Sequence, residues 1–304
     1  MVSDNTTYKY DTDYKRYYQD TAFSKMDITK ITEENVKVFI RTTVGRLNLC
    51  KSACKTLFGY TNNVFKSAMI NHYISENPMQ YLSPKFFYQY CTEKQKSKEK
   101  TLVLDKDMVL LCEQLQEDYK NQPEYIPSYA VELAILTGMR VGEIAALTWD
   151  SISKDGILIN KSEKYNRKTN TYFIDATKNK KERLFPMCNE ISNLLDKVKK
   201  AELQNGYICE WVFANEDGRV HAPVISSCIK NKCRQLGIEE RGIHALRKTF
   251  NSKIRNIGVA PTVAATLLGH SVEVNQKYYT FDVTSNDEKK EIVSLINENL
   301  PLAK

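Results

Sequence analysis

Two of the four histidines in this chain are spaced regularly from an arginine and a tyrosine in its last quarter. His244 precedes Arg247 by three residues, and His270 precedes Tyr279 by nine. Residues at positions i and i+3 are neighbours on one face of a helix, so His244 and Arg247 could bind one anionic oxygen centre together. Histidine and arginine at this spacing also occur on ordinary solvated helix faces, so the pair alone is a weak signal.

A second candidate cation lies upstream. The apolar pattern of residues 131–136 predicts a helix that ends near Gly138, after which Arg140 opens a new apolar run. Arg140 would then stand near the positive end of a helix dipole. Either Glu143, three residues later, compensates this charge, or an anion normally lies opposite it. The simplest alternative is an ordinary helix ion pair between the two side chains.

In chain order, the motifs T-G-x-R-x-x-E, H-x-x-R and L-G-H followed by a tyrosine resemble the catalytic domain of the tyrosine recombinases. These are the integrases of temperate phages and conjugative transposons, with their relatives that resolve chromosome dimers. The resemblance covers roughly the last two thirds of the chain strongly and the first third more loosely. In that family the nucleophilic tyrosine follows the L-G-H histidine by nine positions, which selects Tyr279 over Tyr278.

The resemblance implies the exchange of one phosphodiester for another through a covalent intermediate. Arg140 and Arg247 would neutralise the charge that the transition state places on the non-bridging oxygens, and His270 would hold another such oxygen. His244 would accept the proton of Tyr279, or hydrogen-bond to it, as this tyrosine attacks phosphorus to give a 3′-phosphotyrosine. Because the tyrosine ester conserves the energy of the broken bond, resealing through a Holliday junction would need no ATP.

The leaving 5′-oxygen needs a proton, which a lysine on a β-hairpin turn supplies in this family. Alignment on K-x-x-K-x-R followed by a proline selects Lys178, with Lys180 and Lys181 as close competitors. At least two of these three are expected to be solvated turn residues. The full expected catalytic set is Arg140, Lys178, His244, Arg247, His270 and the nucleophile Tyr279, with Glu143 in support of Arg140.

No cofactor and no metal are expected. Two arginines and a lysine would do what Mg²⁺ does in other enzymes, and no acidic cluster suited to two metal ions is seen. The eight cysteines include no C-x-x-C pair and no Cys/His quartet at zinc spacing, so free thiols are the better interpretation. No signal peptide and no apolar run of membrane length is found, which favours a cytoplasmic protein acting at the bacterial nucleoid.

Length and charge favour two domains that act on a polyanion. The 304 residues carry a formal net charge of +7, and the first 100 hold sixteen Lys and Arg against ten Asp and Glu. By resemblance, residues 1–91 form a helical core-binding domain that closes over the duplex opposite the catalytic domain, as a clamp. Residues 92–100 predict a flexible linker. The catalytic domain is expected over 101–280, and 281–304 form a tail helix that docks on a neighbouring protomer or on its own domain.

The predicted fold is mainly α-helical with a small antiparallel β-sheet. Residues 6–20 predict a helix whose tyrosines form a core-facing stripe, although such rings could also stack on sugars or bases. Thr32 predicts the start of another helix. Residues 47–79 predict two more, the second stopping at Asn77 because a proline follows. The buried side of the helix after Thr32 is expected to comprise Val36, Val38, Phe39 and Ile40.

The second domain is predicted to be a mixed α+β domain. Residues 108–119 predict a helix, and the alternating stretch 156–187 predicts a small antiparallel sheet. Two amphipathic helices follow, over 191–203 and 224–236. His221 lies in a turn-like segment and is expected to be structural or exposed. The tail carries an apolar stripe that needs a docking surface, made of Ile292, Val293, Leu295 and Ile296.

The expected function is site-specific recombination of DNA, for integration or excision of a mobile element. The expected partner is double-stranded DNA with specific sites, on which the protein would assemble as a dimer or tetramer, with or without accessory DNA-bending or excision factors. Two alternatives are a type IB topoisomerase and a DNA-binding relative without activity. The basic helical first domain, the L-G-H spacing and the complete catalytic set favour the recombinase. Most integrases carry an arm-site-binding domain before the core-binding domain, and this sequence begins too late to include one. Either the element is expected to have no arm sites, or the chain is a fragment of a longer protein.

Overall fold

The structure is a computed structural model in which the chain divides into two compact units. The first unit contains residues 1–95 and the second contains residues 96–304, except that the hairpin turn 166–170 is grouped with the first. Each unit has its own hydrophobic core. The residues that the structure describes are 3–93, 101–177, 181–281, 289–291 and 293–294, without the side chain of Tyr278.

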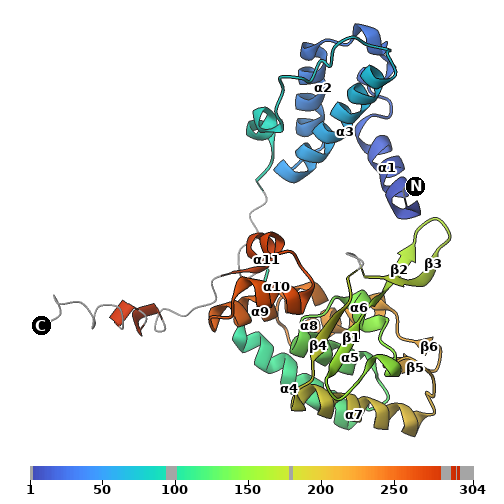
Figure 1. The fold of residues 1–304 in the computed structure, drawn as a ribbon, viewed down its shortest axis with the longest axis vertical. Coiled ribbons are helices and arrows are strands. Elements are labelled where there is room, and N and C mark those ends of the chain that lie inside the picture. Colours follow the sequence, from blue (N-terminus) through green and yellow to red (C-terminus); the bar gives the residue numbers. More distant parts are fainter. Residues whose placement is uncertain (1–2, 94–100, 178–180, 282–288, 292, 295–304) are drawn as a thin grey trace, which may run out of the picture. The chain divides into compact units, whose positions relative to one another are not determined.

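The first unit is helical, as expected (Figure 1). Its elements are α1 (Asp4–Tyr17), η1 (Phe23–Lys25), η2 (Ile28–Lys30), α2 (Glu33–Arg46), α3 (Lys51–Ile70) and η3 (Pro84–Tyr90). The helix start predicted at Thr32 is confirmed, because Thr32 and Asn35 form a capping box. The Thr32 hydroxyl accepts from the Asn35 N–H at 3.3 Å, and the Asn35 side-chain oxygen accepts from the Thr32 N–H at 2.9 Å.

One prediction for α2 and one for α3 are wrong. Val38 is 42% exposed, because it lies off the stripe that Val36, Phe39 and Ile40 bury. Residues 51–70 form one helix, which ends well before Pro78. The Asn71 side chain donates to the Ser67 carbonyl at 2.8 Å and His72 adopts a left-handed φ of 58°, so local hydrogen bonding ends the helix.

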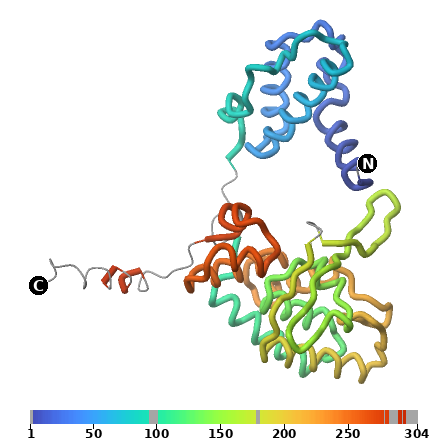
Figure 2. The backbone as a smooth tube through the Cα atoms, viewed as in Figure 1, coloured from blue at the N-terminus to red at the C-terminus, as the bar shows by residue number. Residues whose placement is uncertain are grey.

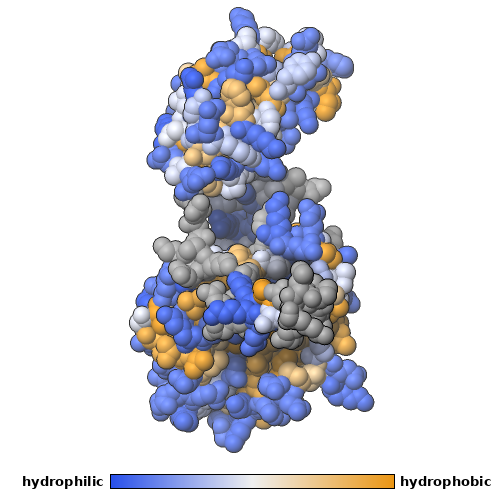
Figure 3. Space-filling view, turned by 90° about the vertical axis from the view of Figure 1, so that its left-hand side faces the viewer, coloured by the Kyte–Doolittle hydropathy of each residue, from blue (hydrophilic) through white to orange (hydrophobic). Residues whose placement is uncertain are grey.

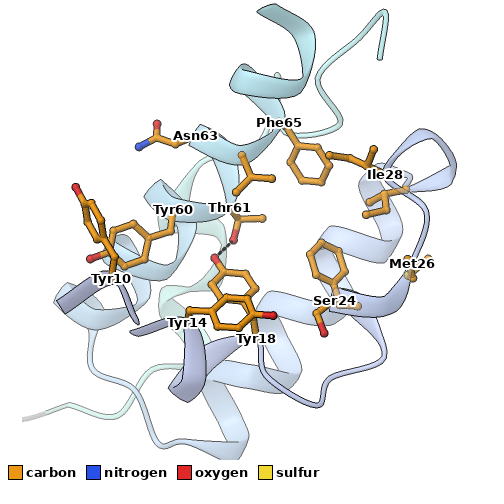
Figure 4. A pocket seen from close by; sticks show the side chains of 13 residues that line it. Tyr10, Tyr14, Tyr18, Ser24, Met26, Ile28, Tyr60, Thr61, Asn63 and Phe65 are labelled. Atoms are coloured by element: carbon orange, nitrogen blue, oxygen red, sulfur yellow. Dashed lines mark hydrogen bonds between the residues drawn. The ribbon is translucent and has the colours of Figure 1, made fainter. Parts of the chain in front are cut away.

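The tyrosines of α1 divide between the core and the surface. Tyr17 is buried and the Tyr18 hydroxyl lies 2.8 Å from that of Thr61, whereas Tyr8, Tyr10 and Tyr14 are exposed, so the core-facing stripe is wrong for these three. A hollow of about 590 Å³ lies beside them (Figure 4). In the space-filling view of Figure 3, this unit shows hydrophobic patches surrounded by hydrophilic residues. The hollow is lined by Tyr10, Tyr14, Tyr18, Phe23, Ser24, Met26, Ile28, Ile31, Tyr60, Thr61, Asn63, Val64 and Phe65.

The second unit combines helices with short antiparallel strand pairs. Its helices are α4 (Asp105–Asn121), α5 (Pro127–Thr137), α6 (Val141–Ala145), η4 (Trp149–Ser151), α7 (Asn189–Asn205), α8 (Ala222–Gln235), α9 (Ile243–Asn256), α10 (Pro261–Leu268) and α11 (Val272–Tyr279). Its strands are β1 (Gly156–Ile159), β2 (Lys161–Asn166), β3 (Thr171–Ala176), β4 (Arg183–Pro186), β5 (Ala214–Asn215) and β6 (Gly218–Arg219). In the described part of the chain, the expected sheet is divided into separate pairs, β1 with β4 and β2 with β3.

Helix α5 lies at the centre of this unit, packed against α4, α6, α7, α8 and α9. It is apolar nearly all round, as a fully enclosed helix should be. It ends at Gly138, whose φ of 61° is left-handed. A Cβ on Gly138 would lie 2.9 Å from the Phe250 ring and 3.1 Å from Leu268, so only glycine allows α9 and α10 to approach this turn. The turn that leads to Arg140 is thereby fixed against both helices.

Helices α9, α10 and α11 pack on one another at the end of the described chain (Figure 2). His221 has the structural environment that the sequence suggested: its Nδ1 lies 2.9 Å from the buried Glu163 carboxylate, and its ring stacks on Tyr172. Of the predicted apolar stripe in the tail, Ile292, Leu295 and Ile296 lie outside the described residues. Val293 is described and is exposed. No described helix has the length and apolar character needed to cross a bilayer.

Candidate active site

Arg140 is held at the start of α6 by Glu143. Its backbone N–H donates to Glu143 Oε2 at 3.0 Å, and its guanidinium Nη1 donates to Oε1 at 2.7 Å. The carboxylate thus caps the helix and fixes the arginine in one step. Nη2 of Arg140 donates to the Gly269 carbonyl at 3.2 Å, which brings Arg140 to the turn that carries His270. The ion pair expected between Arg140 and Glu143 is therefore present.

Glu143 is buried and also binds a second arginine, Arg183 on β4. Arg183 Nη2 lies 2.6 Å from Glu143 Oε2, and Nη1 lies 3.1 Å from Oε1. Burial alone would raise the pKa of Glu143. The hydrogen bonds and charge of Arg183, together with the charge of Arg140, instead lower this pKa to about 2. Glu143 is therefore ionised at neutral pH and anchors both cations.

Arg247 is fully buried, at the meeting point of two helix ends. Its Nη1 donates to the Gly138 carbonyl at 2.7 Å, and its Nη2 donates to the Leu268 carbonyl. These carbonyls belong to the C-terminal turns of α5 and α10, where helix dipoles place partial negative charge. Nη2 also lies 2.7 Å from Nε2 of His270. Helix ends thus supply the partners that keep this guanidinium in place.

Tyr279, the last residue of α11, faces this cluster. Its hydroxyl lies 3.0 Å from Nε2 of His244, and its ring centroid lies 4.0 Å from that of His270. The Arg247 guanidinium carbon lies 5.6 Å from the Tyr279 ring centroid. At the backbone, the Tyr279 carbonyl accepts from the Asn251 side chain at 2.8 Å. The end of α11 is therefore fastened to α9, the helix that carries His244 and Arg247.

Burial and the nearby cations make both site histidines weak bases. Burial, together with Arg247, Lys248 and Arg140, lowers the pKa of His244 to about 4. The outer side of His244 is exposed, so water screens part of this repulsion. Burial, together with Arg247, Arg140 and Arg183, lowers the pKa of His270 to about 3. Both imidazoles are therefore neutral at pH 7.

The structure brings five members of the expected set together. Arg140, Arg247 and His270 meet at the turn after α10, while His244 and Tyr279 face each other beside them. Lys178 lies outside the described residues, as does Lys180, and Lys181 is exposed. The side chain of Tyr278 also lies outside the described part.

Three residues in the site received no role from the sequence. Arg183 is the arginine of the K-x-x-K-x-R motif, which served only to align the lysine. Asn251 and Asn275 are buried, and the Asn275 side chain donates to Asn251 at 2.6 Å, so Asn275 supports the anchor of Tyr279. Asn251 is a polar residue on the buried side of α9, and this position could have indicated from the sequence that it has a specific partner.

The arrangement suits an anionic ligand. Arg140 and Arg183 bind the carboxylate of Glu143, and the charge of Arg247 interacts with it without direct contact, so the site has an excess of positive charge. Nε of Arg247 and Nδ1 of His270 are buried and find no hydrogen-bond partner in the described part of the chain. Among the described residues, no group of His, Cys, Asp and Glu is arranged to hold a metal ion. Planar guanidinium groups can bind two oxygens of a phosphate at once.

Comparison with known proteins decides the family. Residues 104–284, more than half of the chain, match the model of the phage integrase family. The chain belongs to the phage integrase family. This family member is an enzyme of the tyrosine recombinase type, which breaks and rejoins DNA. The resemblance drawn from the motifs is thereby confirmed.

The integrase has similar relatives of known sequence or structure. It is 24% identical to a tyrosine recombinase XerC-like protein of Caldanaerobacter subterraneus subsp. tengcongensis, over 96% of this chain and 78% of that protein. Its fold is similar to that of the Tn1549 transposon integrase in complex with circular intermediate DNA, with a TM-score of 0.76 and 17% identity over 97% of this chain and 94% of the other. A lambda integrase dimer bound to a core site gives a TM-score of 0.63 and 15% identity, over 94% and 76%.

Proposed function

We propose that this integrase is a site-specific recombinase in which Tyr279 attacks a DNA phosphodiester to form a 3′-phosphotyrosyl intermediate. Exchange of two pairs of strands through a Holliday junction would integrate or excise a mobile element. The observation that carries the proposal is the contact of 3.0 Å between the Tyr279 hydroxyl and His244, beside a buried arginine. A tyrosine held against a neutral imidazole and a fixed cation is suited to attack an anionic phosphorus centre.

The phosphate would be bound by the arginines. Arg140 is partly exposed and can turn an N–H toward a ligand, whereas Arg247 is immobilised by two carbonyls. Preorganised donors of this kind stabilise developing charge without having to reorganise during the reaction. Nε2 of His270 now accepts from the Arg247 guanidinium. To hold a further phosphate oxygen, His270 would give up this contact and donate from Nε2, as the tautomer that carries its proton on that nitrogen.

Proton transfer would use two further groups. His244 has a depressed pKa, so it stays neutral at pH 7 and can accept the tyrosine proton at Nε2. Lys178 is proposed as the general acid for the leaving 5′-oxygen on the family motif alone. Arg183, five residues later, binds Glu143, so the lysine turn begins close in sequence to a residue of this cluster.

DNA is the proposed partner of both units. The first 100 residues carry most of the net positive charge, which supports a role as the core-binding half of a clamp. The lambda integrase has been solved as a dimer on a core site and as a tetramer on a Holliday junction. We infer that this integrase also assembles on its sites as a dimer or tetramer, with the tail taking part in the contacts between protomers.

A nicked suicide substrate tests this proposal, because loss of the short strand beyond the nick traps the covalent complex. Tyr279→Phe should bind DNA as the wild type does and form no adduct, while the neighbouring Tyr278→Phe should still form one. An assay with two target sites then separates the alternatives. A recombinase gives recombinant products, a topoisomerase only relaxes supercoils, and an inactive relative forms no adduct. A wild-type protein that binds its site without forming an adduct would overturn the proposal.

A further inference from the structure

We propose that Arg183 is a positioning residue for cleavage, which keeps Arg140 available to the phosphate and ties the turn before His270 to the same carboxylate. This inference rests on the proposed function. It concerns a side chain that the catalytic set omits, although it lies at the centre of the site.

The division of the Glu143 carboxylate between two arginines is the first observation. Arg183 binds it with two guanidinium nitrogens, at 2.6 and 3.1 Å, whereas Arg140 uses one guanidinium nitrogen and its backbone N–H. Two parallel N–H bonds are the stronger and more directional arrangement. The side chains of Arg183 and Glu143 are 8% and 1% exposed, so this pair is a buried anchor, and Arg140, 24% exposed, is the more accessible partner.

Charge gives the second reason. One carboxylate paired with Arg140 alone would offset the positive charge that a phosphate needs. With Arg183 present, the triad has a net positive charge, so Arg140 can bind an anion while Glu143 still fixes its position. Removal of Arg183 would leave a buried carboxylate with Arg140 as its remaining arginine, and would pull Arg140 more tightly onto it.

The turn after α10 provides the third observation. Arg183 Nε donates to the Leu267 carbonyl at 2.9 Å, and Arg140 Nη2 donates to the Gly269 carbonyl at 3.2 Å. A Cβ on Gly269, whose φ is 63°, would lie 2.9 Å from Arg183 Nη1, so a side chain at this position would displace the guanidinium from its present place. His270 follows directly. Arg183 therefore links β4, α6 and the end of α10. Arg140 lies at the start of α6, and His270 follows the end of α10.

The test compares Arg183→Gln and Arg183→Lys with Arg241→Gln as the matched control. Arg241 is also buried, and its Nε also donates to a carbonyl, that of Leu102, at 2.9 Å. Its carboxylate partner is Glu239 rather than a group on α6. Each protein is assayed for DNA affinity, for melting temperature, and for the single-turnover rate of adduct formation at saturating suicide substrate, well below the melting temperature.

We expect Arg183→Gln to slow adduct formation by about 10- to 100-fold, the range found for outer partners of metal ligands, with DNA affinity changed much less. Arg183→Lys keeps the charge but cannot form the two parallel hydrogen bonds of the guanidinium with Glu143. Its rate should therefore lie between those of Arg183→Gln and the wild type. Arg241→Gln should lower the melting temperature and leave the rate unchanged.

An Arg183→Gln rate equal to that of the wild type, with only the melting temperature lowered, would reduce Arg183 to a structural residue and overturn the inference. If Arg183→Gln has no cooperative melt, Arg183→Lys decides: a reduced rate supports the inference, and a wild-type rate overturns it. A wild-type protein that forms no adduct would instead mean that the proposed function itself has failed.

Discussion

The hydroxyl of Tyr279 lies 3.0 Å from Nε2 of His244, the distance at which a proton acceptor would meet a nucleophile. The pKa of His244, lowered to about 4, leaves Nε2 unprotonated at pH 7. His270, with its pKa lowered to about 3, lies with its ring centroid 4.0 Å from that of the tyrosine and accepts from Arg247. The tyrosine therefore contacts two neutral imidazoles, and the positive charge beside it belongs to arginine.

The first prediction concerns the pH dependence of folding in the DNA-free protein. Unfolded histidines have a pKa of about 6.5, so between pH 6.5 and 4 the unfolded chain binds protons that folded His270 does not. The contribution of His270 to the free energy of unfolding should be constant above pH 6.5 and should decrease as the pH falls below 6.5. His270→Asn should flatten the fall in melting temperature between pH 6.5 and 5. Parallel curves for wild type and variant over this range would contradict the lowered pKa, and the constant offset above pH 7 is the internal control.

Arg247 should matter for folding as well as for cleavage. In Arg247→Gln the carbonyls of Gly138 and Leu268 lose a buried donor, at about 1–3 kcal/mol each, so stability should fall by roughly 2–6 kcal/mol and adduct formation should stop. Arg140→Gln should also stop the adduct, with a smaller loss of stability, because this side chain is partly exposed. Urea unfolding and the suicide substrate measure both effects. Equal stability losses for the two variants would mean that the helix-end contacts of Arg247 contribute little.

Gly142 allows α6 to pack directly on β2. A Cβ at this position would lie 2.7 Å from the backbone carbonyl oxygen of Glu163 and 2.7 Å from the Ser162 hydroxyl. Gly142→Ala should therefore destabilise the protein by about 1–3 kcal/mol and slow adduct formation, since α6 carries Glu143 and begins at Arg140. Gly59→Ala is the matched control. It lies within α3 with nothing near its Cβ position, so it should stabilise by about 0.5–1 kcal/mol. A Gly142→Ala protein as stable as Gly59→Ala would refute this close approach.

Cleavage should not require a divalent metal. The charge of the transition state would be neutralised by Arg140 and Arg247, both held in place by the protein itself. Adduct formation in EDTA should therefore match that in Mg²⁺. A metal-dependent restriction enzyme acting on the same substrate confirms that chelation is complete. Loss of the adduct in EDTA and its recovery with Mg²⁺ would mean that the arginines alone are insufficient.

Sequence patterns predicted the parts of the site that local spacing determines. One helical turn joins Arg140 to Glu143, and the motif spacing from His270 singled out Tyr279, which faces His244 in the structure. The start of α2 at Thr32 was equally legible, because a capping residue acts within one turn.

Contacts between distant segments were not predictable in this way. Arg183 meets Glu143 across 40 residues, and Asn251 meets the Tyr279 carbonyl across 28. Neither pairing leaves a periodic signal, because it depends on how β4, α6, α9 and α11 pack. The end of α3 at Ile70 was missed for a different reason: a side-chain cap and a left-handed residue ended the helix before the proline did.

The identity of the nucleophile is the central claim, and direct mapping of the covalent adduct tests it. The trapped complex would be digested with nuclease and trypsin. The peptide that retains nucleotide would then be fragmented in a mass spectrometer. Cleavage after Lys277 gives a peptide that begins at Tyr278, so fragment ions distinguish the two adjacent tyrosines. We predict that the nucleotide is esterified to Tyr279. Nucleotide on Tyr278, or on any residue outside this cluster, would contradict the account.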